Sequence, residues 1–131
     1  MKHILIVDDN KTNLITAKTV LSEHYKVTAV PMGSQALKYL ENNSCDMILL
    51  DIDMPEMNGF EVIRKIKERQ MENEPPVLFL TGNTEPEILS QCIEEGGMDV
   101  MEKPFVNNVL LNRLSLLFEV LEARQRFAKT V

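Results

Sequence analysis

Cysteine pairs, long hydrophobic runs and an excess of basic residues are all missing from this sequence. Its two cysteines, Cys45 and Cys92, lie far apart and form no C-x-x-C unit, which argues against a zinc site or a disulfide framework. No apolar run approaches the ~20 residues of a membrane span. The four-residue run near the N-terminus is too short for a signal peptide. We therefore expect two free, buried or half-buried thiols in a protein of the reducing cytoplasm.

The charge balance is acidic, with a formal net charge of −6. This balance disfavours non-specific binding to nucleic acid or to anionic membranes, because both are polyanions. The 131 residues favour a single domain, and the 44% of hydrophobic residues can supply its core. We expect a globular domain with no direct nucleic-acid or membrane partner.

Short apolar runs recur along the chain, at residues 4–7, 27–30, 47–50, 77–80 and 98–101. Runs of this length that are rich in Val, Ile and Leu are typical of parallel strands covered on both faces. Segments with helical periodicity lie between them, and a fifth such segment follows the last run. The alternation predicts an α/β fold, with an open, doubly wound, five-stranded parallel sheet and helices on both of its faces.

Turn and cap signals place the helix boundaries. Gly33-Ser34 opens the second predicted helix, and Asn58-Gly59 acts as a turn or cap before the third. Residues 84–87 (TEPE) form a predicted capping box for the fourth helix, with Pro86 in its first turn. Gly96-Gly97 ends that helix.

The last helix is predicted to run from Asn107 to about Lys129 without a breaker, whereas ~12 residues would cover a five-residue strand. Leu110, Leu114, Leu117 and Leu121 make one apolar seam, and Leu111 and Phe118 make a second. Two alternatives stay open. Either the second seam faces a partner chain or a following domain, or both seams form one wide core face and the polar end is frayed.

Polar and charged residues follow four of the predicted strands: Asp8 and Asp9 the first, Asp51 and Asp53 the third, Thr81 the fourth and Lys103 the fifth. Ligands of parallel α/β sheets bind outside the carboxyl ends of the strands. If these four strands are neighbours, three carboxylates, a hydroxyl and an ammonium group meet at one edge.

Crowded carboxylates need a compensating cation, and hard oxygen ligands with an open side suit Mg²⁺ or Mn²⁺. Asp8, Asp9 and Asp51 contribute −3, which a divalent ion and Lys103 balance. Such a site can accept a phosphoryl group, with an aspartate as the nucleophile of an acyl phosphate. The metal and the lysine would offset the charge of the transferring group.

Four motifs, in this order and spacing, identify a family: LIVDDN (5–10), LLDIDMPEMNG (49–59), LFLTG (78–82) and EKPF (102–105). Together they resemble the receiver domains of two-component response regulators, chemotaxis receivers among them. The resemblance covers about residues 2 to 122. It implies a flavodoxin-like sheet of strand order 2-1-3-4-5. We expect a receiver domain over residues 1–122, and an extension of the last helix over 123–131 that links to an output domain or ends a stand-alone receiver.

The resemblance also implies the role of each site residue. Asp51 matches the phosphoacceptor, and Thr81 and Lys103 match the groups that bind the phosphoryl oxygens. Asp9 matches the direct Mg²⁺ ligand, Asp8 a ligand that acts largely through water, and Asp53 the residue whose backbone carbonyl reaches the metal. The Lys103-Pro104 bond is expected to be cis.

Two features depart from the family pattern. Receivers usually carry Tyr or Phe three residues before the lysine, and here that position is Val100. Valine cannot report activation by a ring movement, so the usual route to the output face is in doubt. Gly82 replaces the small residue, often Ala, that follows the threonine. Asp53 and Asn83 occupy the positions that tune the lifetime of the phosphoryl group in the family.

The resulting hypothesis is a cytoplasmic, phosphorylation-activated switch that catalyses only its own phosphotransfer and slow dephosphorylation. Its expected partners are a histidine kinase or phosphotransfer protein, a downstream output domain or protein, and a second copy bound through the last helix. One alternative is a small phosphatase of the haloacid dehalogenase type, which LLDID mimics, but the order of its acidic motifs is reversed here. The other is a phosphorylation-independent binding module, which should have lost a key acid or the lysine. Each residue, taken alone, also has a purely structural interpretation; Asp8 and Asp9, for example, could cap a helix.

Overall fold

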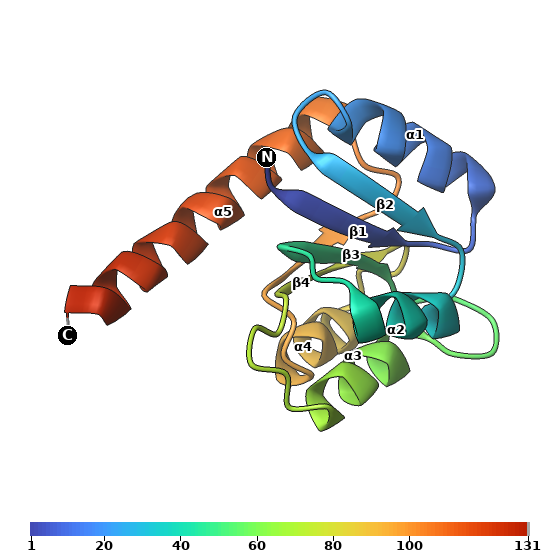
Figure 1. Cartoon of the computed structure of the whole chain (residues 1–131). Coiled ribbons are helices and arrows are strands. Elements are labelled where there is room, and N and C mark those ends of the chain that lie inside the picture. Colours follow the sequence, from blue (N-terminus) through green and yellow to red (C-terminus); the bar gives the residue numbers. More distant parts are fainter. Residues whose placement is uncertain (131) are drawn as a thin grey trace.

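The computed structural model describes residues 1–130, and strands and helices alternate along this whole length (Figure 1). In chain order the elements are β1 (His3–Val7), α1 (Lys11–Leu21), β2 (Lys26–Val30), α2 (Gly33–Asn42), β3 (Met47–Asp51), α3 (Gly59–Glu68), β4 (Val77–Thr81), α4 (Pro86–Glu94), β5 (Asp99–Glu102) and α5 (Asn107–Thr130). Each predicted strand and helix is therefore present. Val131, the last residue of the predicted extension, lies outside the described residues.

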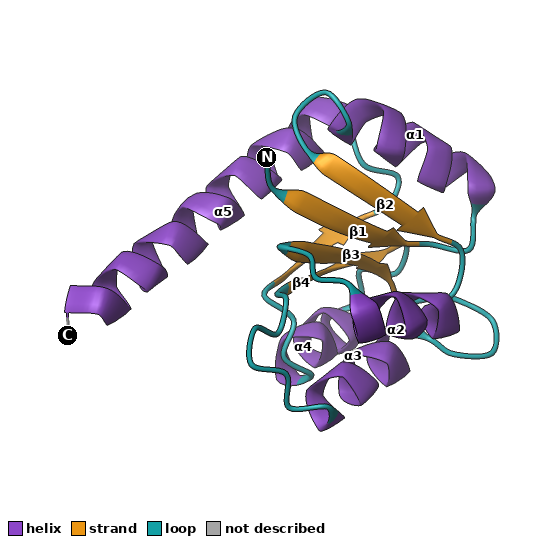
Figure 2. Cartoon of the chain, in the orientation of Figure 1, coloured by secondary structure: helices purple, strands orange, loops and turns teal. Residues whose placement is uncertain are grey.

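The five strands form one parallel sheet of order β2-β1-β3-β4-β5 (Figure 2). Strand β1 pairs on both sides, so that Ile4 is in register with Val27 of β2 and with Met47 of β3. The direction in which the chain adds strands reverses between β1 and β3. Such a reversal opens a crevice at the carboxyl ends of the two strands, where ligands of this fold class bind.

Successive side chains of a strand point to opposite faces, and here each face has its own helical cover. Leu5, Ile48 and Phe79 pack in the core cluster that α2, α3 and α4 close. Ile4, Leu49 and Leu78 pack in the cluster that α1 and α5 close. Figure 1 shows these two groups of helices on opposite sides of the sheet. The arrangement confirms the predicted doubly wound fold.

Two of the predicted helix starts differ in outcome. Asn58 caps α3 in a full capping box, because its side chain accepts from Glu61 N and the Glu61 side chain accepts from Asn58 N. The capping box predicted for α4 at residues 84–87 is wrong. That helix begins at Pro86, one residue too late for Thr84 to be its cap, and Asn83 Oδ1 instead accepts from Glu85 N at 3.0 Å.

Helix α5 is regular over 24 residues and extends well beyond the sheet (Figure 1). Leu111 and Phe118 pack in the same cluster as Leu110 and Leu114, and Phe118 is buried. The alternative of one wide core face is therefore correct, and the idea that Leu111 and Phe118 face a partner is wrong. The polar end remains helical as far as Thr130, so the expected fraying is not seen.

Both cysteines are free thiols, with Cys92 buried and Cys45 partly buried, as predicted. Among residues 1–130, none of the helices combines the length and the hydrophobicity that a membrane span requires.

Candidate functional site

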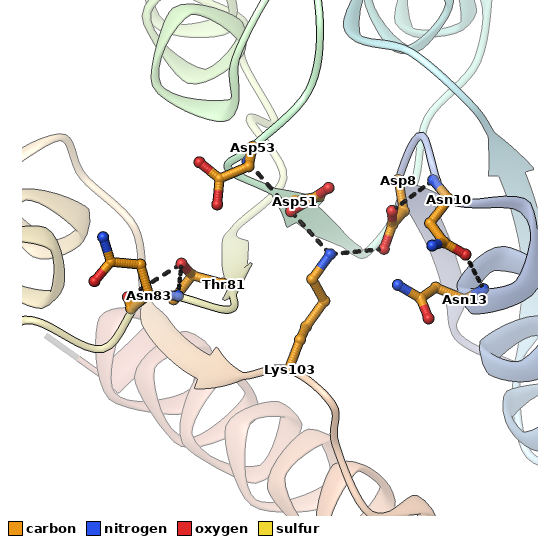
Figure 3. Close-up of polar contacts among 8 residues, drawn as sticks. All are labelled: Asp8, Asn10, Asn13, Asp51, Asp53, Thr81, Asn83 and Lys103. Atoms are coloured by element: carbon orange, nitrogen blue, oxygen red, sulfur yellow. Dashed lines mark hydrogen bonds and ion pairs between the residues drawn. The ribbon is translucent and has the colours of Figure 1, made fainter.

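The sheet brings the predicted site residues together at one edge, at the reversal between β1 and β3 (Figure 3). Asp51 is the last residue of β3 and Asp8 directly follows β1; each residue is only 1% exposed. Thr81 ends β4 and is fully buried, and Lys103 directly follows β5. Four strand ends therefore deliver their polar groups to the same place, as the sequence predicted.

Lys103 joins the two buried carboxylates. Its Nζ lies 3.0 Å from Asp51 Oδ1 and 3.3 Å from Asp8 Oδ2, and only 17% of its side chain is exposed. Its backbone N–H also donates to Thr81 O at 2.7 Å, which fixes the start of the following loop against β4. The Lys103–Pro104 peptide bond is cis, as the resemblance implied. The ammonium group is thus held over the edge of β3 rather than in solvent (Figure 3).

Neither of the two acids in the turn after β1 caps helix α1. The N-cap of α1 is Asn10, whose Oδ1 accepts from Asn13 N at 3.0 Å. Asp8 Oδ1 accepts from Asn10 N at 2.9 Å, which orients the Asp8 carboxylate. The other oxygen, Oδ2, still faces Lys103 in the site. The structural interpretation of Asp8 and Asp9 as helix caps is therefore wrong. The role of Asn10 was not predicted, although an Asn just before a helical segment is itself a cap signal.

The backbone around Asp51 is fixed by its own loop and by α3. Asp53 N donates to Asp51 Oδ1 at 3.3 Å, so that one carboxylate oxygen receives both this N–H and Lys103. Gly59, the first residue of α3, donates its N–H to Ile52 O at 2.9 Å. A Cβ at position 59 would lie 2.6 Å from Asp51 O, so only glycine lets the helix approach the strand end this closely.

Three carboxylates form a cluster that could hold a metal ion. One oxygen of each of Asp8, Asp9 and Asp51 lies within 4.8 Å of the others. Asp8 and Asp51 are buried and Asp9 is exposed, so the cluster is open to solvent on one side. A set of hard oxygen ligands with an open side fits a divalent cation that keeps part of its water shell. The Asp53 side chain is exposed and is not part of this cluster.

The ionisation of Asp51 reflects this crowding. Burial, reinforced by the negative charge of Asp8, raises the pKa of Asp51 to about 7, although the hydrogen bond and charge of Lys103 act in the opposite direction. For Lys103, burial alone would lower the pKa, but its bonds to Asp51 and Asp8 outweigh burial and raise it. The lysine alone therefore does not neutralise the edge, and a further positive charge would lower the pKa of Asp51.

The Thr81 hydroxyl is engaged with the loop that follows β4. Its Oγ1 accepts from Asn83 N at 2.9 Å and donates to Asn83 O at 3.1 Å. Among residues 1–130, no hydrogen bond joins Thr81 to Asp51 or to the Lys103 side chain. Val100 lies on β5 opposite Phe79 and packs partly buried against the cluster under α2–α4. The hydroxyl would have to leave Asn83 to reach a group bound at Asp51.

Comparisons with known proteins agree with this geometry. The family model of the response regulator receiver domain matches residues 4–115. A rice two-component response regulator, ORR11 (Oryza sativa subsp. indica), is 36% identical over 104 residues, which are 78% of this chain and 71% of that protein. A probable cyclic di-GMP phosphodiesterase of Vibrio cholerae is 40% identical over 111 residues, which are 85% of this chain but only 25% of that protein.

The fold has the same counterparts among solved structures. A CheY-like response regulator receiver domain protein from Methanospirillum hungatei JF-1 superposes with a TM-score of 0.85 at 26% identity, covering 95% of this chain and 98% of that one. The match does not favour the phosphatase alternative. This chain belongs to the receiver-domain family of two-component response regulators, which are phosphorylation-activated signalling switches.

Proposed function

We propose that this receiver accepts a phosphoryl group on Asp51, from a histidine kinase or a phosphotransfer protein, and that the modified domain changes its affinity for a downstream partner. The observation that carries the proposal is the placement of Asp51. Its carboxylate is almost fully buried at a strand end, is fixed by Lys103, and shares a solvent-facing cluster with Asp8 and Asp9.

The transfer itself needs little from the protein besides orientation and charge. A carboxylate oxygen of Asp51 attacks phosphorus and the bond between phosphorus and the donor atom breaks, so an acyl phosphate forms and the leaving group departs with the bonding electrons and takes up a proton. Lys103 and Asp53 N already fix the Asp51 carboxylate in one orientation. Because Lys103 is anchored to Asp8 as well, it can turn to a phosphoryl oxygen with little movement.

Asp8, Asp9 and Asp51 are the side chains that would hold a Mg²⁺ ion, or Mn²⁺ in its place, with the backbone carbonyl of Asp53 as a further ligand. When bound, the ion would supply positive charge to the phosphoryl oxygens. The exposure of Asp9 supports its assignment as the direct ligand, because it faces the side from which a partly hydrated ion arrives. The buried Asp8, bonded to Asn10 N and Lys103, suits a role through water.

Return to the resting state is hydrolysis, in which water attacks phosphorus and the Asp51 oxygen–phosphorus bond breaks to release phosphate. Asp53 and Asn83 follow Asp51 and Thr81 by two residues, and the resemblance to the family assigns these positions to the control of the lifetime of the phosphoryl group. Asn83 holds Thr81 through its backbone and Glu85 through its side chain. A shift of Thr81 toward a phosphoryl oxygen would therefore disturb the start of α4, which provides a route for the signal that needs no aromatic ring at position 100.

The proposed downstream partner is an output domain or a separate protein. The chain spans about a quarter of the Vibrio cholerae phosphodiesterase that it matches, and about 70% of the rice regulator. These relatives differ in how much further chain accompanies the matched region. A cytoplasmic location is proposed with the kinase partner.

The deciding experiment measures incorporation of radiolabelled phosphate from acetyl phosphate and from a histidine kinase. We expect the wild type to be labelled with Mg²⁺ present and to lose nearly all label with chelator. Asp51→Asn should take up no label with either donor. The matched control is Asp46→Asn, because Asp46 is exposed and lies just before the other end of β3. Equal labelling of Asp51→Asn and wild type would place the acceptor elsewhere, and rapid turnover of para-nitrophenyl phosphate would favour a phosphatase.

A further inference from the structure

A second pocket lies at the amino ends of the strands, where α5 leaves the body of the domain (Figure 1). Its walls come from Lys2 ahead of β1, from the loops that lead into β3 and β4, and from Phe118, Leu121 and Gln125 of α5. We call it the amino-end pocket. Its volume is about 430 Å³, which is within the range of small-molecule sites. Because all the strands are parallel, this pocket and Asp51 lie at opposite edges of the sheet.

The floor of the amino-end pocket is apolar. Pro75 is buried, Phe118 is only 7% exposed, and Cys45 and Leu121 are partly buried. The Cys45 thiol belongs to this apolar floor, because burial raises its pKa to about 12 and keeps it neutral. The rim is polar, with exposed side chains at Asn73 and elsewhere in the two loops. A floor and rim of these kinds suit a small molecule with one apolar and one polar end.

Lys2 gives the pocket its positive charge. Its side chain is partly buried, and its Nζ lies over the Phe118 ring, 5.8 Å from the ring centroid. Within residues 1–130 this ammonium group forms no ion pair with a carboxylate. The ring holds the ammonium group at the pocket but does not neutralise it, so the group can pair with an anion that enters.

The two carboxylates that line the pocket already have partners. Asp46 Oδ2 accepts from His3 N at 2.7 Å, and Glu74 Oε2 lies 2.5 Å from Lys67 Nζ. Lys2 is therefore the charged group of the pocket that lacks a counter-ion within the described part of the chain. The acids still set a limit on the ligand, because a second negative charge on it would meet Asp46 or Glu74.

Two carboxamides complete the donor set around Lys2. Asn73 stands on the loop before β4 and Gln125 on α5, so they approach the pocket from the body and from the helix. Neither side chain hydrogen-bonds to another group among residues 1–130, and each carries an NH₂ group that can donate to a carboxylate oxygen. One ammonium group and two amides above an apolar floor match a singly charged carboxylate with an apolar body.

We propose that the amino-end pocket binds a small organic monocarboxylate, with its carboxylate at Lys2 and its apolar body on the floor formed by Pro75 and Leu121. A bound ligand would contact α5 and the body of the domain at once. The proposal does not depend on the acceptor role of Asp51, and its tests use neither phosphodonor nor Mg²⁺.

The first test titrates the whole chain at neutral pH with phenylbutyrate and follows the amide chemical shifts by NMR. We expect a dissociation constant in the millimolar range, typical of a ligand with about a dozen non-hydrogen atoms, and shifts centred on Lys2, Cys45, Asn73 and Gln125. Phenylbutanol and phenylbutylamine should each bind at least about tenfold more weakly, because neither can pair with Lys2. Equal binding of the three compounds, or shifts scattered over other surfaces, would overturn the proposal.

The second test changes the pocket. Lys2→Gln should weaken phenylbutyrate binding by about tenfold, whereas Lys18→Gln, the same change at an exposed lysine of α1, should leave it unchanged. Gln125→Trp should block the pocket with its ring, and Ala123→Trp is the matched control, since position 123 is exposed but does not line the pocket. Amide spectra without ligand check that each variant is folded. Equal losses in Lys2→Gln and Lys18→Gln, or full binding to Gln125→Trp, would show that the acid does not bind in this pocket.

Discussion

The interior of the sheet and its carboxyl edge are built from the same strands, yet they contribute to stability with opposite signs. The contrast falls within β3, whose first four residues place apolar side chains in the two core clusters. Its fifth residue, Asp51, is equally buried but is a carboxylate whose pKa is raised to about 7. Burial of apolar side chains thus stabilises the interior, whereas burial of a carboxylate destabilises the edge.

The difference indicates which property each region serves. A fully apolar edge would be more stable, but it could bind no cation and accept no phosphoryl group. The apolar interior makes the charged edge tolerable, because it fixes the strand ends so that Lys103 reaches two carboxylates at once. Four changes, in decreasing order of expected effect on the free energy of unfolding, would test this contrast.

The largest effect is expected from the interior. Ile48→Ala on β3 should lower the free energy of unfolding by about 3 kcal/mol, because it leaves a cavity in a fully buried part of the core. Urea denaturation followed by circular dichroism measures the change. The control is Ile15→Ala on α1, where the same side chain is 65% exposed, and the cost should stay below about 0.5 kcal/mol. Equal losses at the two positions would contradict the assigned core.

The edge should respond in the opposite direction. Burial raises the pKa of Asp51 from its ordinary value of 3.8 to about 7 in the fold, so the protonated carboxyl favours folding. Without divalent cations, the stability of the wild type should therefore fall as the pH rises from about 4 to above 7. Each pKa unit corresponds to about 1.4 kcal/mol, and relaxation with water penetration at the open side reduces the sum to about 2 kcal/mol.

Asp51→Asn removes that charge and should be more stable than the metal-free wild type by this amount at pH 8, and similar to it near pH 4. Thermal unfolding across pH gives the comparison. Glu122→Gln, an exposed carboxyl on α5, should leave the pH profile of the wild type unchanged. A stabilisation that does not grow with pH would show that ionisation of Asp51 is not the cause.

Mg²⁺ should reverse part of the cost of the charged edge. At about ten times the dissociation constant, bound ion adds about 1.4 kcal/mol to the free energy of unfolding. Thermal unfolding at constant ionic strength, with MgCl₂ replaced by NaCl as the reference, measures it. Asp9→Asn should abolish the effect while it leaves the fold intact, because Asp9 is exposed. Full Mg²⁺ stabilisation of this variant would remove Asp9 from the ligand set.

The smallest effect is expected from the cap of α3, the helix that packs against the backbone of the charged edge. Asn58→Ala removes the cap of α3 and should cost about 1 kcal/mol, whereas Asn58→Asp keeps an acceptor for Glu61 N and should cost much less. Urea denaturation distinguishes the two. Because α3 begins against the backbone of Asp51, hydrogen exchange at Asp53 N should also be faster in Asn58→Ala. An unchanged exchange rate at Asp53 N would show that the cap of α3 does not affect the geometry of the site.

The strands, the helices and the strand-end positions of the candidate site residues could be predicted from the sequence, because they depend on short-range signals, whereas the strand order that brings those residues together was implied only by the family resemblance. Five apolar runs mark the strands, and the residue at the end of each run is at the sheet edge whatever the packing of the helices. The start of α4 was predicted one residue early, because residues 84–87 satisfy the pattern of a capping box, whereas Asn83 competes for Glu85 N only once the loop has folded around Thr81.

The side of α5 that faces the sheet could not be recognised from the sequence for a similar reason. Leucine and phenylalanine occur on several sides of this helix, and each set follows an acceptable repeat. Which side faces the sheet is decided by the rotation of the helix against α1 and the strands. That rotation buries Phe118 and leaves Leu116 exposed, although either could have packed inward. The roles of Asp9, Asp53 and Thr81 toward a metal or a phosphoryl group remain predictions that the experiments above address.

The continuity of α5 has a mechanical consequence. Leu121 is the last residue of α5 that packs on the sheet cluster, and nine residues follow it up to the end of the helix at Thr130. At 1.5 Å per residue they form a stiff arm of about 13 Å. For an arm of this length, a rotation of about 5° at its base would move the tip sideways by about 1 Å. A small repacking beneath the root of this helix therefore reaches whatever touches its far end as a displacement, with no hinge along the way to absorb it.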